Sequence, residues 1–318
     1  MKVGFIGLGN VGGKLAESVL RNGFDLTVRD LDPAKTEQFR SAGASVADSP
    51  KEIAETCEII VTCLPSPSAS ASVMEDENGI LAGLSEGKIW IEMSTTDQQE
   101  VLRLGQEVKN LGALPADCPV SGGCHRAATG NIAIFAGCER VVFERVLPLL
   151  ARMGQQVLHT GELGSASVLK VVTNYLATAN LLSLSEALVT TKAAGLDLAT
   201  AYEAIRISSG NSFVHETESQ VILNGSRDIN FTMDLVIKDI SLFQEIADRE
   251  NVPLEISPLL IEIFNDAQNK YGPREWSPNV IRRLEDATGV DVRTGGFPSQ
   301  MVDDEPERLG EEVVVSRK

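Results

Sequence analysis

The sequence has few cysteines, a deficit of basic residues and no long apolar segment. Its five cysteines, Cys57, Cys63, Cys118, Cys124 and Cys138, are odd in number and form no C-x-x-C pair, which argues against a disulfide framework and a zinc knuckle. No run of about 18 apolar residues is present to cross a bilayer, and the first residues lack the apolar stretch of a secretory signal. We therefore expect a reduced, cytoplasmic protein without a metal site.

Basic residues are scarce, because 28 Lys and Arg stand against 45 Asp and Glu, a formal net charge of −17. A surface this acidic repels phosphate backbones and anionic lipids, so we expect neither nucleic acid nor a membrane surface as a partner. An anionic substrate would have to be bound by local positive groups that overcome this field.

Chain length and hydrophobic patterning predict two domains. The 318 residues correspond to two domains at the usual size of about 150 residues each. In residues 1–163, short apolar runs alternate with helical patterns, which predicts an α/β domain of the Rossmann type with a parallel, doubly wound sheet. The expected strands are residues 2–6, 24–29, 58–64, 88–93 and 133–135, and the helical patterns include residues 11–21 and 97–111.

Strand signals nearly vanish after residue 163. A segment rich in Leu, Ala and Val runs from Ala166 to Ala194 without Pro or Gly, and residues 198–207, 233–249 and 257–271 also have helical patterns. We expect an all-helical domain over residues 164–294, introduced by a long interdomain helix, and then a loosely held acidic tail over residues 295–318. The acidic residues of this tail are Asp303, Asp304, Glu305, Glu307, Glu311 and Glu312.

A nucleotide-binding signal lies at the first strand–helix turn, where residues 7–12 read GLGNVG. In a G-x-G-x-x-G turn the first glycine permits the tight turn, the second lets a pyrophosphate approach the backbone, and the third packs helix on strand. The helix N-terminus then offers free N–H groups to the phosphates. The candidate cofactor-binding residues of this turn are Gly7, Leu8, Gly9, Asn10, Val11 and Gly12.

Asp30 ends the second expected strand, about 20 residues after the glycine turn, where such folds carry a ribose-binding carboxylate. A carboxylate there binds the ribose hydroxyls and repels a 2′-phosphate, and the next residue is Leu31 rather than a cation. Strand alternation directs Arg29 to the opposite face. NAD is therefore preferred over NADP, and Asp30 can at the same time form an Asx turn before Asp32.

Two further segments carry chemistry. Residues 117–123 read DCPVSGG, and the Ser121-Gly122-Gly123 turn offers consecutive unobstructed N–H groups, a suitable nest for a carboxylate. At the start of the long helix, Lys170 and Asn174 stand four residues apart and therefore share one face. A lone Lys on such a helix is commonly a solvent-facing residue, but it occurs here together with the other motifs.

Taken together, these motifs resemble those of the β-hydroxyacid dehydrogenase family, which includes 3-hydroxyisobutyrate dehydrogenase, tartronate semialdehyde reductase and, more distantly, 6-phosphogluconate dehydrogenase. The resemblance covers about residues 2–290. It departs from the family pattern at Val11, where Met is usual, and at Thr173, which replaces the first residue of an Asn pair.

The resemblance adds cofactor-binding residues. Leu64-Pro65 and Ser94-Thr95 are similar to the two loops that line the nicotinamide half of the cofactor. Lys238 is similar to a lysine that contacts the cofactor from the helical domain, although a Lys–Asp pair on a helix is commonly solvated surface.

The resemblance also implies a division of roles. The Ser121-Gly122-Gly123 turn would anchor the substrate carboxylate, and Lys170 would take the hydroxyl proton during oxidation or donate one during aldehyde reduction. Asn174 would hold the substrate hydroxyl or Lys170 in position. The reaction requires no metal.

Arg126 stands where the family usually has a smaller residue, often Gly. It could bind a second anionic group on the substrate, such as a carboxylate, sulfonate or phosphate. Equally, it could pair with Glu139 or Glu144 on the surface. His125 is expected to be a loop residue, because Lys170 already fills the proton-handling role.

We expect an NAD-dependent oxidoreductase acting on a CH–OH group, which interconverts a small 3-hydroxy acid resembling 3-hydroxyisobutyrate and its semialdehyde. The alternative enzyme is a reductase of tartronate semialdehyde, succinate semialdehyde or sulfolactaldehyde, and the non-enzymatic alternative is a silent oligomeric scaffold. Lys170 disfavours both an imine reductase and the scaffold. The resemblance implies a homodimer or homotetramer.

Overall fold

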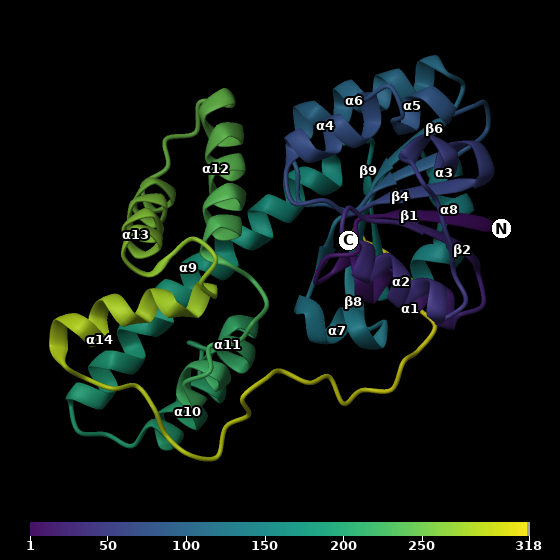
Figure 1. The fold of residues 1–318 in the computed structure, drawn as a ribbon. Coiled ribbons are helices and arrows are strands. Elements are labelled where there is room, and N and C mark those ends of the chain that lie inside the picture. Colours follow the sequence, from purple (N-terminus) through teal and green to yellow (C-terminus); the bar gives the residue numbers. More distant parts are fainter. Residues whose placement is uncertain (317–318) are drawn as a thin grey trace. The chain divides into compact units, whose positions relative to one another are not determined.

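The computed structural model describes residues 1–316, and the chain divides into two compact units. The first unit contains Met1–Lys170 together with the C-terminal segment from Asp303 onwards, and the second contains Val171–Val302. Figure 1 shows a sheet with flanking helices in the first unit and helices in the second. These features confirm the expected fold class, a Rossmann-like domain followed by an all-helical one.

The sheet of the first unit joins ten strands in the order β10-β9-β8-β6-β5-β4-β1-β2-β3 within the described residues, and β7 pairs with β8 off this path. Most neighbours are parallel, but β6 and β8 are antiparallel. The strands are β1 (Lys2–Ile6), β2 (Asp25–Arg29), β3 (Ser45–Val46), β4 (Ile59–Thr62), β5 (Ile89–Glu92), β6 (Leu114–Asp117), β7 (Val120–Ser121), β8 (Ile132–Gly137), β9 (Gly154–Gly161) and β10 (Glu311–Glu312).

Helices cover both faces of this sheet, because two separate apolar clusters pack against it. Leu15, Phe39 and Phe143 belong to one cluster, and Ile53 and Met74 belong to the other. β4 and β5 are buried at every position, as expected for central strands covered on both sides. The helices are α1 (Gly12–Arg21), α2 (Pro33–Ser41), α3 (Pro50–Thr56), α4 (Pro67–Glu75), α5 (Ile80–Gly83), α6 (Gln98–Asn110), α7 (Gly123–Thr129) and α8 (Arg140–Met153).

The long helix α9 (Ser165–Ala193) begins in the first unit and continues into the second, close to the expected residues 166–194. Around it the second unit contains α10 (Leu198–Arg206), α11 (Phe213–Asn224), α12 (Met233–Arg249), α13 (Ile256–Tyr271), the 3-10 helix η1 (Ser277–Ile281) and α14 (Arg282–Thr288). Leu188 of α9, Ile222 of α11, Ile240 of α12 and Phe264 of α13 are buried in one apolar cluster. Hydrophobic burial therefore holds these helices together.

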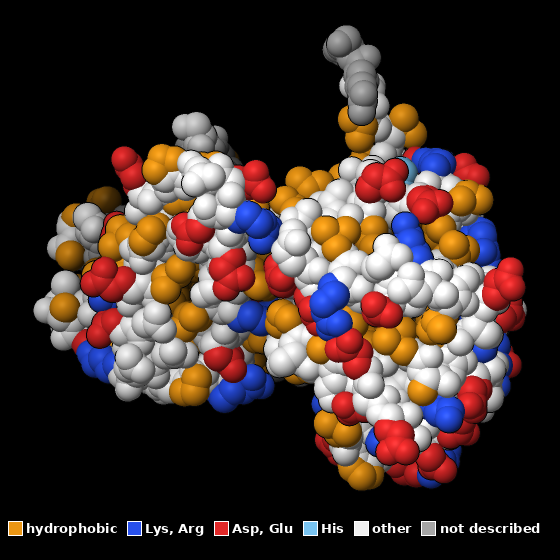
Figure 2. Space-filling view, turned by 90° about the horizontal axis from the view of Figure 1, so that it is seen from above, with side chains coloured by type: hydrophobic (Ala, Val, Ile, Leu, Met, Phe, Trp, Pro, Cys, Tyr) orange, Lys and Arg blue, Asp and Glu red, His pale blue; other side chains and the backbone are white. Residues whose placement is uncertain are grey.

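On the face drawn in Figure 2, acidic and basic side chains are interspersed. Within residues 1–316, none of the helices combines the length and apolarity needed to cross a membrane.

The C-terminal segment corrects the expectation of a loosely held tail. Residues from 303 onwards belong to the first unit, where β10 pairs in parallel with β9 at the sheet edge. Gly310 N donates to Ala151 O at 2.8 Å, and Arg140 forms two hydrogen bonds of 2.5 and 2.9 Å with Glu312. Glu312 therefore has a defined partner, which composition alone does not reveal.

The docking of this segment depends on close backbone packing at Gly310. A Cβ at this position would lie 1.9 Å from the carbonyl O of Gly154. We expect Gly310→Ala to lower the free energy of unfolding by about 1–3 kcal/mol, because the strand must shift outwards. Gly295→Ala, which meets no atom within 4 Å, should change it by less than about 0.5 kcal/mol. Urea denaturation of both variants tests this, and equal midpoints would contradict the packing argument.

Glu218 of α11 provides a pH-dependent test of the second unit. Its Oε2 atom is buried and has no hydrogen-bond partner among the described residues. Burial raises the pKa of Glu218 from 4.5 to about 8. Between these values the folded protein holds a proton that the unfolded chain loses, so the free energy of unfolding falls as pH rises through this window.

Glu218→Gln cannot ionise and should escape this loss. We expect it to be about 1–3 kcal/mol more stable than the wild type at pH 8, with the difference shrinking as pH falls towards 4.5. The matched control is Glu262→Gln, at an exposed position of α13. Urea unfolding at pH 5 and pH 8 measures the effect, and a difference independent of pH would show that Glu218 is not the titrating group.

Candidate active site

The glycine turn after β1 has three different environments at its three glycines. Gly7 has a φ of 97°, and a Cβ there would lie 2.3 Å from Cys63 O. A Cβ at Gly12 would lie 2.2 Å from Gly7 O, whereas one at Gly9 would meet nothing within 4 Å. Gly7 and Gly12 are therefore required by packing. Gly9 faces open space, which fits a turn whose backbone receives a pyrophosphate.

Helix α1 begins directly after this turn. Its N-cap residue Val11 makes no side-chain hydrogen bond to the helix, and Asn10 is exposed. A helix N-terminus of this kind offers N–H groups and the positive end of the helix dipole to phosphates. The turn and α1 together fit the diphosphate of a dinucleotide.

Asp30 links the end of β2 to the glycine turn. Its Oδ2 accepts a hydrogen bond from Leu8 N at 2.6 Å, and its Oδ1 accepts one from Asp32 N at 2.8 Å. The second bond is the Asx turn that the sequence allowed. Each oxygen keeps a lone pair, so the carboxylate can also accept from ribose hydroxyls. Leu31 is 92% exposed, and Arg29 donates to the backbone carbonyl of Asp30.

The two loops assigned to the nicotinamide half of the cofactor are tied together. Leu64 N donates to Ser94 Oγ at 2.7 Å, and the Ser94 hydroxyl donates to the carboxylate of Glu92. Glu92 ends β5 and also accepts from Ser94 N at 2.8 Å; burial raises its pKa. The sequence analysis missed Glu92, because in the sequence it is only a polar residue at the end of an expected strand.

The Ser-Gly-Gly turn is the proposed anion nest. Ser121 ends β7, and Gly122 and Gly123 follow with φ values of 128° and 87°. Neither glycine has a side chain that could cover the backbone N–H groups of this turn. A Cβ at Gly122 would lie 3.3 Å from Arg126 Cδ, and a Cβ at Gly123 would lie 2.9 Å from His125 Cε1. Both side chains therefore flank the turn.

Asp117 connects the strand that leads to this turn with the start of α9. Its Oδ1 accepts from Gly164 N at 2.8 Å, and its Oδ2 accepts from Ser167 N at 2.7 Å and Ser167 Oγ at 2.9 Å. Unpaired N–H groups at a helix N-terminus need such acceptors, and here a buried carboxylate from another element supplies them. Lys170 follows Ser167 by three residues, so this cap sets its position.

Gly137 makes room for the Asp117 cap. A Cβ on Gly137 would lie 2.3 Å from Asp117 Oδ1 and 2.9 Å from Ser165 Oγ. The sequence analysis quoted Asp117 within a motif but assigned it no role, and it missed Gly137, because a helix cap supplied by a distant strand leaves no local signal.

Lys170 and Asn174 share one face of α9, as expected. Lys170 is 7% exposed, which excludes the solvent-facing alternative. In the second unit, Asn174 Nδ2 donates to Asp239 Oδ2 at 2.5 Å, and Lys238 Nζ lies 2.8 Å from Asp239 Oδ1. Asp239 was missed by the sequence analysis, which treated it only as the neighbour of Lys238.

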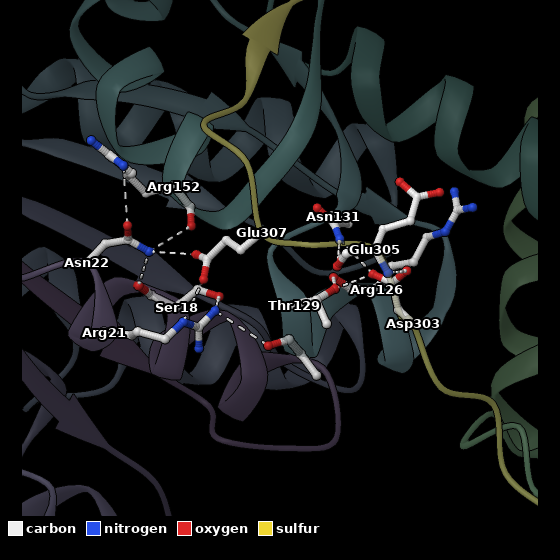
Figure 3. A network of polar contacts seen from close by, with 11 residues as sticks. Ser18, Arg21, Asn22, Arg126, Thr129, Asn131, Arg152, Asp303, Glu305 and Glu307 are labelled. Atoms are coloured by element: carbon white, nitrogen blue, oxygen red, sulfur yellow. Dashed lines mark hydrogen bonds and ion pairs between the residues drawn. The ribbon is translucent and has the colours of Figure 1, made fainter.

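The surface partners considered for Arg126 are engaged elsewhere. Glu139 lies 3.3 Å from Lys109, and Glu144 lies 3.0 Å from Arg140. Burial works to raise the pKa of Asp303, and the charge of Arg126 is one of the factors that lower it. Figure 3 draws these two residues in one network with the C-terminal segment.

Comparison with known families matches both halves of the chain. Residues 2–161 match the model described as the NAD binding domain of 6-phosphogluconate dehydrogenase, and residues 164–284 match NAD-binding of NADP-dependent 3-hydroxyisobutyrate dehydrogenase. The chain is 33% identical over 296 residues to 2-(hydroxymethyl)glutarate dehydrogenase of Eubacterium barkeri, covering 93% of this chain and 98% of that protein. The chain belongs to the β-hydroxyacid dehydrogenase family.

Other members of the family agree with this placement. The mitochondrial 3-hydroxyisobutyrate dehydrogenase of Rattus norvegicus is 32% identical over 283 residues, which cover 86% of this chain and 84% of that protein. The crystal structure of 3-hydroxyisobutyrate dehydrogenase from Salmonella typhimurium superposes with a TM-score of 0.82 at 26% identity, covering 89% and 99% of the two chains. The family consists of oxidoreductases that bind NAD(P) and act on the CH–OH group of hydroxy acids.

The cap that Asp117 forms at the start of α9 gives a testable prediction. Asp117→Asn keeps the side-chain size but turns an amide donor towards backbone donors, so we expect it to lower the free energy of unfolding by about 2–4 kcal/mol. Ser167→Ala removes only the hydroxyl bond and should cost about 1 kcal/mol. Urea denaturation compares the two, and an Asp117→Asn variant as stable as Ser167→Ala would mean that the carboxylate does not hold α9.

Proposed function

We propose that the protein is an NAD-dependent dehydrogenase that interconverts a small 3-hydroxy acid, 3-hydroxyisobutyrate or a close analogue, and its semialdehyde. The observation that carries the proposal is the Asp117 cap. It joins the strand leading to the Ser-Gly-Gly turn to the helix turn that bears the buried Lys170. The proposed carboxylate anchor and proton-handling group are thereby carried by two elements that the cap joins.

In this proposal, the N–H groups at Gly122 and Gly123 bind the substrate carboxylate, and Ser121 adds a hydroxyl. Lys170 takes the proton of the substrate hydroxyl during oxidation and returns one to the carbonyl oxygen during reduction. The bound nicotinamide supplies hydride transfer.

Asn174 positions the proton transfer. Asp239 only accepts hydrogen bonds when ionised, so the Asn174 amide must turn its NH2 towards that carboxylate. With this orientation the amide oxygen can accept a hydrogen bond from the Lys170 ammonium, one helical turn away, or from the substrate hydroxyl. Asp239 is thus a positioning residue.

Asp30 supports NAD over NADP, because its carboxylate is held at the end of β2 by Leu8 N and Asp32 N. A 2′-phosphate bound there would face that negative charge. The glycine turn, Leu64, Pro65 and Thr95 would hold the rest of the cofactor. Lys238 is a further candidate cofactor-binding residue, as the family resemblance implies. We further propose a cytoplasmic homodimer or homotetramer, as the family resemblance implies.

A second candidate is a substrate with two anionic groups. Arg126 lies beside Gly122, and a guanidinium there would attract a second carboxylate, sulfonate or phosphate. One relative is named for 2-(hydroxymethyl)glutarate, a dicarboxylate, and another, 28% identical, is named glyoxylate/succinic semialdehyde reductase 1.

The test is turnover followed by NADH absorbance on 3-hydroxyisobutyrate, 3-hydroxypropionate, 4-hydroxybutyrate, glycerate and sulfolactaldehyde. Lys170→Ala should lower kcat by about 10²–10⁴-fold and leave NADH affinity nearly unchanged. The matched control is Lys192→Ala, at an exposed position of the same helix, which should retain wild-type rates. Wild-type rates in Lys170→Ala, or no turnover by the wild type on the whole panel, would reject the proposal and favour a scaffold. NADPH is titrated in parallel and should bind more weakly than NADH.

A further inference from the structure

We propose that Asp303, in the C-terminal segment, determines the substrate charge that this site accepts by offsetting the charge of Arg126. The inference rests on the proposed function, because it takes the Ser-Gly-Gly turn as the place where the substrate anion binds. It assigns a specificity role to a part of the chain outside the motifs.

The Asp303 carboxylate is held in place by the two ends of the α7–β8 connection. Its Oδ2 accepts from the Thr129 hydroxyl and from Asn131 Nδ2, the latter at 2.8 Å. Asn131 Nδ2 also donates to the backbone carbonyl of Glu305 at 3.0 Å. Figure 3 shows these residues converging on the C-terminal segment. The negative charge therefore has a defined position rather than that of a mobile tail.

The segment is fastened again a few residues further on. Glu307 forms an ion pair of 2.8 Å with Arg21 Nε and accepts from Asn22 Nδ2 at 2.9 Å. A Cβ at Gly130 would lie 3.2 Å from Glu307 Oε1, so this side chain also packs on the end of α7. The segment is thus anchored at the C-terminal end of α7 and again at the end of α1, and Asp303 is oriented by its surroundings.

Asp303 and Arg126 act on each other electrostatically. Partial burial alone would raise the pKa of Asp303, but the bonds from Thr129 and Asn131 and the charge of Arg126 hold it below its usual range. Burial lowers the pKa of His125; the charge of Arg126 lowers it further, and that of Asp303 opposes this shift. The same carboxylate thus acts on both side chains that flank the nest.

The Ser-Gly-Gly nest also lies beside Arg126. The Arg126 side chain passes Gly122 so closely that a Cβ there would be 3.3 Å from Arg126 Cδ. A substrate with one carboxylate binds mainly through backbone N–H groups and gains little from Arg126. A substrate with a second anionic group needs the Arg126 charge, which Asp303 partly neutralises. Removing the Asp303 charge should therefore favour dianions selectively.

The experiment measures binding without turnover. Isothermal titration calorimetry of the protein–NADH complex compares succinate, a dianion, with propionate, a monoanion, for the wild type and Asp303→Asn. We expect Asp303→Asn to tighten succinate binding by about three- to ten-fold and propionate binding by less than about two-fold, with the difference shrinking at high salt. The control Asp304→Asn removes the same charge from an exposed neighbour and should change neither.

A double-mutant cycle with Arg126→Gln distinguishes an electrostatic effect from altered docking of the segment. In the Arg126→Gln background, Asp303→Asn should no longer change the succinate-to-propionate ratio. An unchanged ratio in Asp303→Asn alone, the same gain in both backgrounds, or no measurable succinate binding to Asp303→Asn would each overturn the inference. Its failure is separable from that of the proposed function. Absence of turnover on the hydroxy-acid panel rejects the function, whereas the anion affinities test Asp303 alone.

Discussion

The three hydrogen bonds that Asp117 accepts from the start of α9 are the constraint on which the rest of the site depends. They hold the first turn of the long helix against the end of β6, and with it the helix turn that leads to Lys170. Asp117 ends β6, four residues before Ser121, so one short stretch of chain positions both the anion nest and the helix. Gly137 on the neighbouring strand keeps the space for this arrangement open. A buried carboxylate can cap this helix because backbone N–H donors replace the hydrogen bonds to water that burial removes.

The fold was largely predictable because its signals are local. β1 and α12 have the expected bounds, and α9 differs from its prediction by one residue at each end, since hydrophobic periodicity and the lack of Gly and Pro are properties of neighbouring residues. The antiparallel pairing of β6 with β8, and β9 itself, were not predicted. Pairing of strands across the sheet is set by packing of distant segments, which a pattern in one segment does not encode.

The residues of the candidate site also divide into those that a sequence signal indicates and those that it does not. Gly7 and Gly12 could be predicted because turn geometry requires glycine at particular offsets, whereas Lys170 and Asn174 were proposed from the family resemblance of the combined motifs. Asp239 and Glu92 could not, because each works by holding another side chain that is distant in sequence or reads as ordinary polar surface. Asp303 is the extreme case, since 172 residues separate it from Asn131. The acidic composition around Asp303 predicts only a solvent-exposed segment.

The C-terminal segment also bears on the order in which the protein is made. The second unit is inserted between two parts of the first, so the sheet gains β10 only after the whole second unit has been synthesised. Until then the backbone groups of β9 form an open edge, the kind of surface that recruits other strands. A nascent chain that has not yet been made as far as β10 would display this edge of β9. Synthesis of the residues that follow the second unit therefore also covers the part of β9 that pairs with β10.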